Sequence, residues 1–121
     1  MARLLKREAS RRDLIQQWLW YAENASVEVA ERFFQAVDNS LNLLSTQPES
    51  GTLFFVRAPE LRGMRRFPVS GGFEKILFFY FPMPDGVDLV RVIHGSRDLE
   101  RLLSDVFLIV RSTLVCYHAS A

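Results

Sequence analysis

Five cations and one histidine in the second half of the chain are the side chains best suited to chemistry. They are Arg62, Arg65, Arg66, Lys75, His94 and Arg97. Clustered cations bind phosphates or stabilise the charge that develops during phosphoryl transfer, and a histidine can act as a general base. The same residue types also form solvated edges whose arginines pair with nearby acids such as Glu60 and Glu74. The residues alone slightly favour this second interpretation.

The elements that must position these side chains are three predicted strands. Residues 64–69, 76–81 and 87–94 are apolar runs separated by the turns Ser70–Gly72 and Pro82–Gly86, which predicts a three-stranded antiparallel meander. The middle run is apolar on both faces, as in a covered central strand. Pro68 predicts an edge position or an early end for the first strand. A hairpin of this kind would bring several of the cations to one surface, and Gly95 would end the last strand beside His94 and Arg97.

The first half of the chain predicts a helical hairpin that covers one face of this sheet. A capping box at Ser10–Asp13 precedes apolar residues at helical spacing, and Ser26 begins a second helix that ends near Pro48. Residues 4–5 fit either a first strand or a lead-in, and residues 53–56 fit either a short strand or a turn. With a C-terminal helix from Leu99, the fold class is α+β: a helical hairpin on a small, mainly antiparallel twisted sheet.

Length and composition indicate one domain over residues 1–107, followed by an apolar extension over 108–121. That extension packs on the sheet, meets a partner chain, or is a non-native terminus. Two histidines and one cysteine do not supply a metal site, and no nucleotide loop or nucleophile elbow occurs, so neither metal nor cofactor is expected. The lone cysteine, the absence of a signal peptide and the short apolar runs predict a cytoplasmic protein that does not enter membranes.

The order of these segments closely resembles the RelE/ParE toxin superfamily over roughly residues 9–103. The resemblance rests on the Ser10–Leu14 start, Trp18-x-x-Tyr21, Phe33, Pro48 and the ending His94-Gly-Ser-Arg97-Asp98, which is most similar to the ParE branch. Proteins of this superfamily are small cytosolic toxins that an antitoxin wraps and neutralises. RelE-like members cleave mRNA on the ribosome, whereas ParE-like members poison DNA gyrase.

On the ribonuclease pattern, the resemblance implies Arg66 as a phosphate-side base, Lys75 as a basic position on the central strand and Arg97 as the transition-state clamp. The tyrosine of that pattern falls at about Leu103, which cannot transfer a proton. Losing one acid–base group typically costs ~10²–10⁴-fold in rate. His94 could replace it only if its ring faces the cations.

The resemblance therefore predicts a ParE-like toxin that inhibits DNA gyrase by binding and is neutralised by a cognate antitoxin, as a homodimer or a toxin–antitoxin hetero-oligomer. The alternatives are a RelE-like endoribonuclease acting on the ribosome and mRNA, and an inactive module that only binds antitoxin. The target-binding candidates are Arg62, Arg65, Arg66 and Arg97. Partner binding is assigned to Trp20, Phe34 and Phe67, although large aromatics at such spacing are also typical of an ordinary core.

Overall fold

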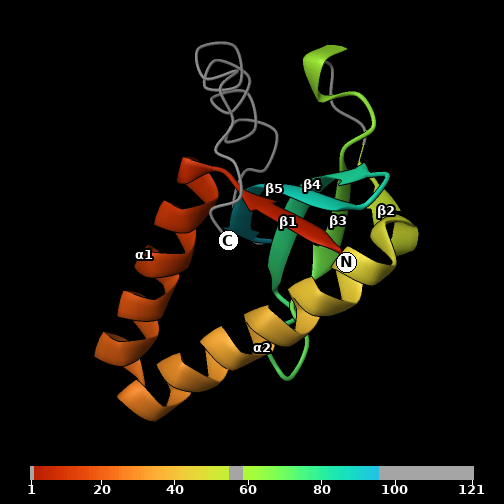
Figure 1. The fold of residues 1–121 in the computed structure, drawn as a ribbon. Coiled ribbons are helices and arrows are strands. Elements are labelled where there is room, and N and C mark those ends of the chain that lie inside the picture. Colours follow the sequence, from red (N-terminus) through yellow and green to blue (C-terminus); the bar gives the residue numbers. More distant parts are fainter. Residues whose placement is uncertain (1, 55–58, 96–121) are drawn as a thin grey trace.

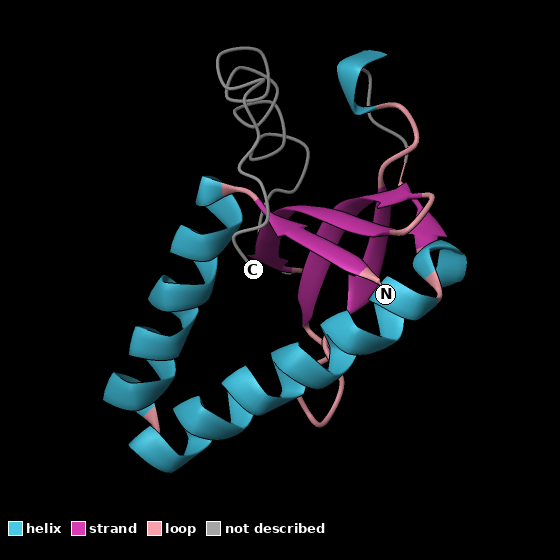
Figure 2. Cartoon of the chain, in the orientation of Figure 1, coloured by secondary structure: helices cyan, strands magenta, loops and turns pink. Residues whose placement is uncertain are grey.

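The computed structural model describes residues 2–54 and 59–95 as two helices packed beneath one five-stranded sheet (Figure 1; Figure 2). The helices are α1 (Glu8–Asn24) and α2 (Val27–Thr46). The strands are β1 (Arg3–Lys6), β2 (Thr52–Leu53), β3 (Arg65–Pro68), β4 (Ile76–Met83) and β5 (Gly86–His94). Two 3₁₀ turns, η1 (Pro48–Ser50) and η2 (Pro59–Leu61), flank β2. This is the predicted α+β architecture.

The sheet has the order β1-β5-β4-β3-β2. The meander β3-β4-β5 is antiparallel, as predicted, and β2 adds two antiparallel residues to β3. Residues 4–5 are a strand: β1 runs parallel to the first half of β5, with Leu4 beside Val87. Pro68 ends β3 beyond the short stretch that pairs with β2, so its missing N–H breaks no bond of that ladder.

The helical hairpin forms as predicted, but the start of its first helix does not. Helix α1 begins at Glu8, with Arg7 at its N-cap and no side-chain cap. Ser10 is buried inside the helix and its Oγ donates to the carbonyl oxygen of Arg7 at 2.7 Å, so the capping-box prediction is wrong. The reason is that the Arg7 N–H is bonded to the Leu89 carbonyl of the sheet, which leaves no linker between strand and helix.

Helix α2 is built by its N-cap and by one apolar stripe, both as predicted. The Ser26 hydroxyl accepts from the Val29 N–H at 3.1 Å, and Glu28 lies in the first turn, where a negative charge favours the helix dipole. The inward positions are fully or nearly fully buried: Ala30, Phe33, Val37, Leu41 and Leu44. This stripe packs the helix against the sheet.

The sheet separates two hydrophobic cores. The larger core lies between sheet and helices and includes Phe33, Phe78 and Tyr80. The smaller one lies on the opposite face, where Phe79 packs with Leu61 and other residues of that face. Strand β4 is therefore covered on both sides, which is why its sequence lacks polar alternation. A bulge between Phe79 and Tyr80 shifts the register of the β4–β5 pair.

None of the described helices is long and apolar enough to cross a membrane. The predicted C-terminal helix from Leu99 and the apolar extension 108–121 lie outside the described residues.

Candidate functional site

The two adjacent arginines of β3 lie on opposite faces of the sheet. Arg65 pairs with Tyr80, which belongs to the core beneath the helices, and Arg66 pairs with Phe79, which belongs to the core on the other face. Residues directly opposite each other in antiparallel strands share a face. Alternation along residues 64–69 of the sequence predicts this separation of Arg65 from Arg66, and the structure confirms it.

Arg65 is used inside the molecule. Its guanidinium donates to the carbonyl oxygens of Gly51 at 2.6 Å and Glu49 at 3.3 Å, and its Nε is buried without a hydrogen-bond partner. These contacts connect β3 to the turn that precedes β2. The guanidinium is thus occupied by the backbone, which favours a structural role over target binding.

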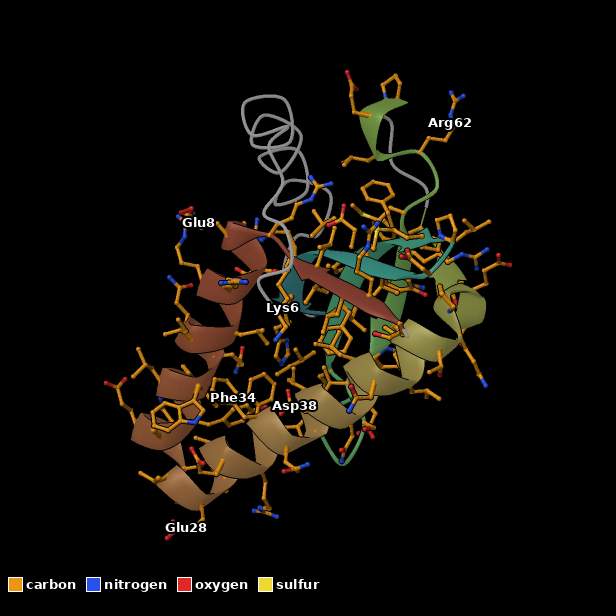
Figure 3. The ribbon with its side chains drawn as sticks, in the orientation of Figure 1. Lys6, Glu8, Glu28, Phe34, Asp38 and Arg62 are labelled. Atoms are coloured by element: carbon orange, nitrogen blue, oxygen red, sulfur yellow. The ribbon has the colours of Figure 1, made fainter. Side chains whose placement is uncertain are left out.

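Arg66 and Arg62 are the cations that the structure leaves open on the face opposite the helices. Both are exposed. The Arg66 guanidinium lies over the Phe54 ring, 5.7 Å from its centroid, a cation–π contact that orients the side chain. Arg62 follows η2 on the excursion that rises from this face, and Figure 3 shows it pointing away from the body of the protein.

Lys75 lies apart from Arg66. It is exposed in the turn before β4, not on the central strand itself. Lys75 lies four positions before Phe79, the partner of Arg66, so the two backbone positions are ~13 Å apart along the strand. The backbone carbonyl of Lys75 accepts from the Gly95 N–H, which places it at the end of β5 instead.

His94 lies on the opposite face from Arg66. It is half-buried and pairs with Ile76, a residue of the core beneath the helices. Regular alternation after Arg91 predicts this placement, since Arg91 pairs with Phe79. The imidazole therefore does not face Arg66 across the sheet. Arg97, the fourth candidate of the ribonuclease pattern after Arg66, Lys75 and His94, lies outside the described residues.

Asp13, which belongs to the predicted capping box, binds β5 instead. Asp13 accepts from Arg91 Nε at 2.6 Å and Nη2 at 3.0 Å, and also from the Val92 backbone N–H at 2.9 Å. Strand β1 pairs only as far as Leu89, so Asp13 occupies the edge of β5 beyond it. A cation–acid pair 78 residues apart leaves no periodic signal in the sequence.

A second ion pair connects the N-cap of α1 to β5. Arg7 Nη2 lies 2.7 Å from Asp88 Oδ2 and its Nε donates to the other carboxylate oxygen at 3.1 Å. Both side chains are largely buried. Together the two bidentate pairs fix α1 along the edge of β5, just before His94.

Tyr80 carries a buried hydroxyl with a backbone role. The hydroxyl donates to the Pro48 carbonyl at 2.7 Å and accepts from the Gly51 N–H at 2.9 Å. Burial raises the pKa of Tyr80 above its ordinary value of 10.0, and the Gly51 hydrogen bond and the Arg65 charge oppose this only in part. The two hydrogen bonds of the hydroxyl connect β4 to the η1 turn and to Gly51 after it.

The partner-binding candidates separate into two groups. Phe67 packs against the core beneath the helices and is half-buried, which fits the ordinary-core interpretation. Trp20 and Phe34 are exposed, at 54% and 38%. Phe34 contacts Trp18, and at 100° per residue Trp18 and Trp20 point to opposite sides of α1. Trp20 and Phe34 therefore do not line one groove.

Among the described residues, no three His, Cys, Asp or Glu side chains gather as metal ligands would. The arrangement that remains is an exposed pair of arginines, Arg62 and Arg66, above a small aromatic core. Such a surface can bind an anionic or protein partner.

The family model described as "ParE toxin of type II toxin-antitoxin system, parDE" matches residues 4–99. The chain belongs to the ParE toxin family. The match begins at the second residue of β1 and extends beyond β5, so the fold and the family agree. No match was found among curated proteins.

The ParE fold is also found in a solved structure, described as the chromosomal ParDE toxin–antitoxin system from P. aeruginosa. The similarity has a TM-score of 0.61 and covers 78% of this chain and 96% of that one. Only 15% of aligned residues are identical, so the comparison establishes the shared ParE fold and not the roles of individual side chains.

Proposed function

We propose that this ParE-family toxin acts by binding DNA gyrase and blocking its reaction, without cleaving RNA. The observation that carries the proposal is the separation of His94 from Arg66 by the sheet. A ribonuclease needs its base, acid and phosphate clamp within hydrogen-bond reach of one phosphodiester. Here the two groups that would exchange protons with the substrate lie on opposite faces.

The other candidate groups add to this argument. Lys75 is ~13 Å along the strand from the position of Arg66, beyond the span of one scissile phosphate. Leu103 replaces the tyrosine of the ribonuclease pattern. The RelE-like alternative therefore rests on Arg97 and on a rearrangement that would bring His94 to the other face.

The binding surface that we assign to gyrase is centred on Arg66 and Arg62, with the excursion that carries Arg62. Arginine is common at the energetic centres of protein interfaces because its planar guanidinium binds carboxylates and stacks on rings. The Phe54 ring beneath Arg66 orders the side chain before binding, which reduces the entropy lost in the complex. Arg97 completes the proposed set.

We also propose that a cognate antitoxin neutralises the protein in the cytoplasm. The similar P. aeruginosa structure is that of a toxin–antitoxin system. On this chain, the exposed ring of Phe34 with its neighbour Trp18 offers an apolar contact that an amphipathic helix fits. Trp20 remains a separate candidate on the other side of α1.

The decisive experiment is DNA supercoiling by purified gyrase with ATP, in the presence of the purified protein. We expect loss of supercoiling with accumulation of cleaved DNA. Arg66→Ala and Arg62→Ala should each require about tenfold more protein for the same effect, the usual scale for an interface arginine. Arg32→Ala, an exposed arginine on α2, is the matched control and should act like the wild type.

Arg65→Ala separates a binding effect from a folding effect. This variant should lower the urea midpoint because the contacts to Glu49 and Gly51 are lost, whereas Arg66→Ala should leave it unchanged. If gyrase is unaffected at concentrations that stop cell growth, and mRNA is cleaved on translating ribosomes, the proposal is wrong and the RelE-like alternative is correct. A fully active Arg62/Arg66 double alanine variant would overturn the assigned surface alone.

A further inference from the structure

The outer side of α1 carries an apolar pair between charged residues. Ile15 and Leu19 are four residues apart and 56% and 47% exposed, although both are large and apolar. With 100° per residue, five side chains fall within an arc of about 80° and form what we call the α1 stripe. In order along the helix they are Glu8, Arg12, Ile15, Leu19 and Glu23.

The apolar pair of the α1 stripe points away from the rest of the domain, whereas Arg12 lies at its border and also lines a surface pocket with Asp13 and Arg91. The buried side of α1 carries Ser10 and Leu14, and Asp13 binds β5 from the flank of that side. In Figure 1 no described element lies beyond the far side of α1, and Figure 3 shows Glu8 projecting outward from it. Within the described part of the chain, the apolar pair has no cover.

The order of charges along the α1 stripe is self-complementary. A basic residue, Arg12, precedes the apolar pair and an acidic residue, Glu23, follows it. In an antiparallel pairing about a two-fold axis level with Gln17, Ile15 of one copy meets Leu19 of the other. Arg12 then lies within about one residue's rise, ~1.5 Å, of the level of Glu23 in the second copy. The axis repeats both contacts, as in any isologous interface.

We propose that the α1 stripe is a homodimer interface, with α1 helices of two copies packed antiparallel. The internal contact of Arg12, an exposed 3.4 Å pair with Glu8, does not prevent this because such surface pairs are worth little. Two acids and one base leave a single negative charge, so the α1 stripe does not select a strongly basic or strongly acidic partner. The order of its charges instead complements the α1 stripe of a second copy in the antiparallel orientation.

The contact is small, which sets the expected strength. One helix stripe per copy lies at the lower end of specific interfaces, so a dissociation constant on the order of 10 µM is expected. Burial of one leucine changes an equilibrium constant roughly tenfold, and the two-fold axis counts each substitution twice. Leu19→Glu should therefore weaken the dimer about 100-fold or more. This inference does not depend on the gyrase target.

The test is sedimentation equilibrium of the full-length protein from about 1 to 100 µM, with far-UV circular dichroism to verify the fold. The wild type should shift from monomer to dimer over this range, and Leu19→Glu should remain monomeric. Leu43→Glu is the matched control, since Leu43 is 45% exposed on α2, away from the α1 stripe, and it should dimerise normally. Glu23→Arg should weaken the dimer, and combining it with Arg12→Glu should restore association.

Three results would overturn the proposal. The first is a wild type that stays monomeric at every concentration. The second is a Leu19→Glu variant that dimerises as well as the wild type, because the interface would then lie elsewhere. The third is equal loss in Leu43→Glu, because the association would then be nonspecific.

Discussion

At the scale of single residues, Asp13 carries the largest predicted effect on stability. Its carboxylate accepts three hydrogen bonds, and the Asp13 and Arg91 side chains are only 11% and 15% exposed. Asp13→Ala leaves the Arg91 charge and the Val92 N–H without their partner. Removing one member of a buried pair typically costs about 3–5 kcal/mol. Urea denaturation should show this loss in the free energy of unfolding.

Glu8→Ala is the control for Asp13→Ala. It breaks the exposed pair with Arg12, for which a change below about 1 kcal/mol is expected. If both variants lose similar stability, the Asp13 contacts do not stabilise the junction between α1 and β5.

Tyr80 predicts a pH dependence at the same scale. Its pKa is raised in the folded protein, mainly by burial, so above pH 10.0 the unfolded chain loses the phenol proton first. The folded state then binds more protons, and the free energy of unfolding falls as pH rises. Urea denaturation at pH 8 and pH 10.5 should show this fall, and Tyr80→Phe should reduce it.

Tyr21, whose pKa burial also raises, contributes part of the remaining dependence on pH. A slope identical in Tyr80→Phe and wild type would contradict the assignment to Tyr80. At neutral pH the same variant should be less stable, because the Pro48 carbonyl and the Gly51 N–H lose their partner.

At the scale of elements, the contribution of the α2 N-cap to stability is the simplest to test. Ser26→Ala removes the acceptor of the Val29 N–H and should cost about 1 kcal/mol, measured by urea denaturation. Ser26→Asp keeps an acceptor and should be close to wild type. If alanine and aspartate behave alike, the cap does not contribute to stability.

The elements also show which features local pattern can predict. Helix α2 and strands β3–β5 were predictable because each has its own cap, stripe or turn within a few residues. The sequence does not decide between a strand and a lead-in at β1, because its partner, β5, lies about 80 residues away. The start of α1 was mispredicted for the same reason: Ser10 has the sequence of a cap, but the Arg7–Leu89 backbone bond fixes the helix start earlier.

At the scale of the whole molecule, the candidate site was only partly predictable. Alternation along residues 64–69 already placed Arg65 and Arg66 on opposite sides, and the structure confirms it. The sequence could not show which of the two arginines binds the protein's own backbone. The Arg65 contacts to Glu49 and Gly51 depend on how η1 folds against β3. Nor could the sequence indicate that Asp13 binds β5 and that Trp20 and Phe34 point apart.

The parallel pairing of β1 with β5 has a consequence for folding kinetics. The first described strand pairs with the last one, and the Arg7–Asp88 and Asp13–Arg91 ion pairs join residues that are as far apart in the sequence. The chain loses the entropy of closing a long loop before these contacts form and stabilise the fold, so they slow folding. The β1 edge of the sheet therefore forms only after β5 has been made, so β1 has no strand partner while the chain between them is synthesised.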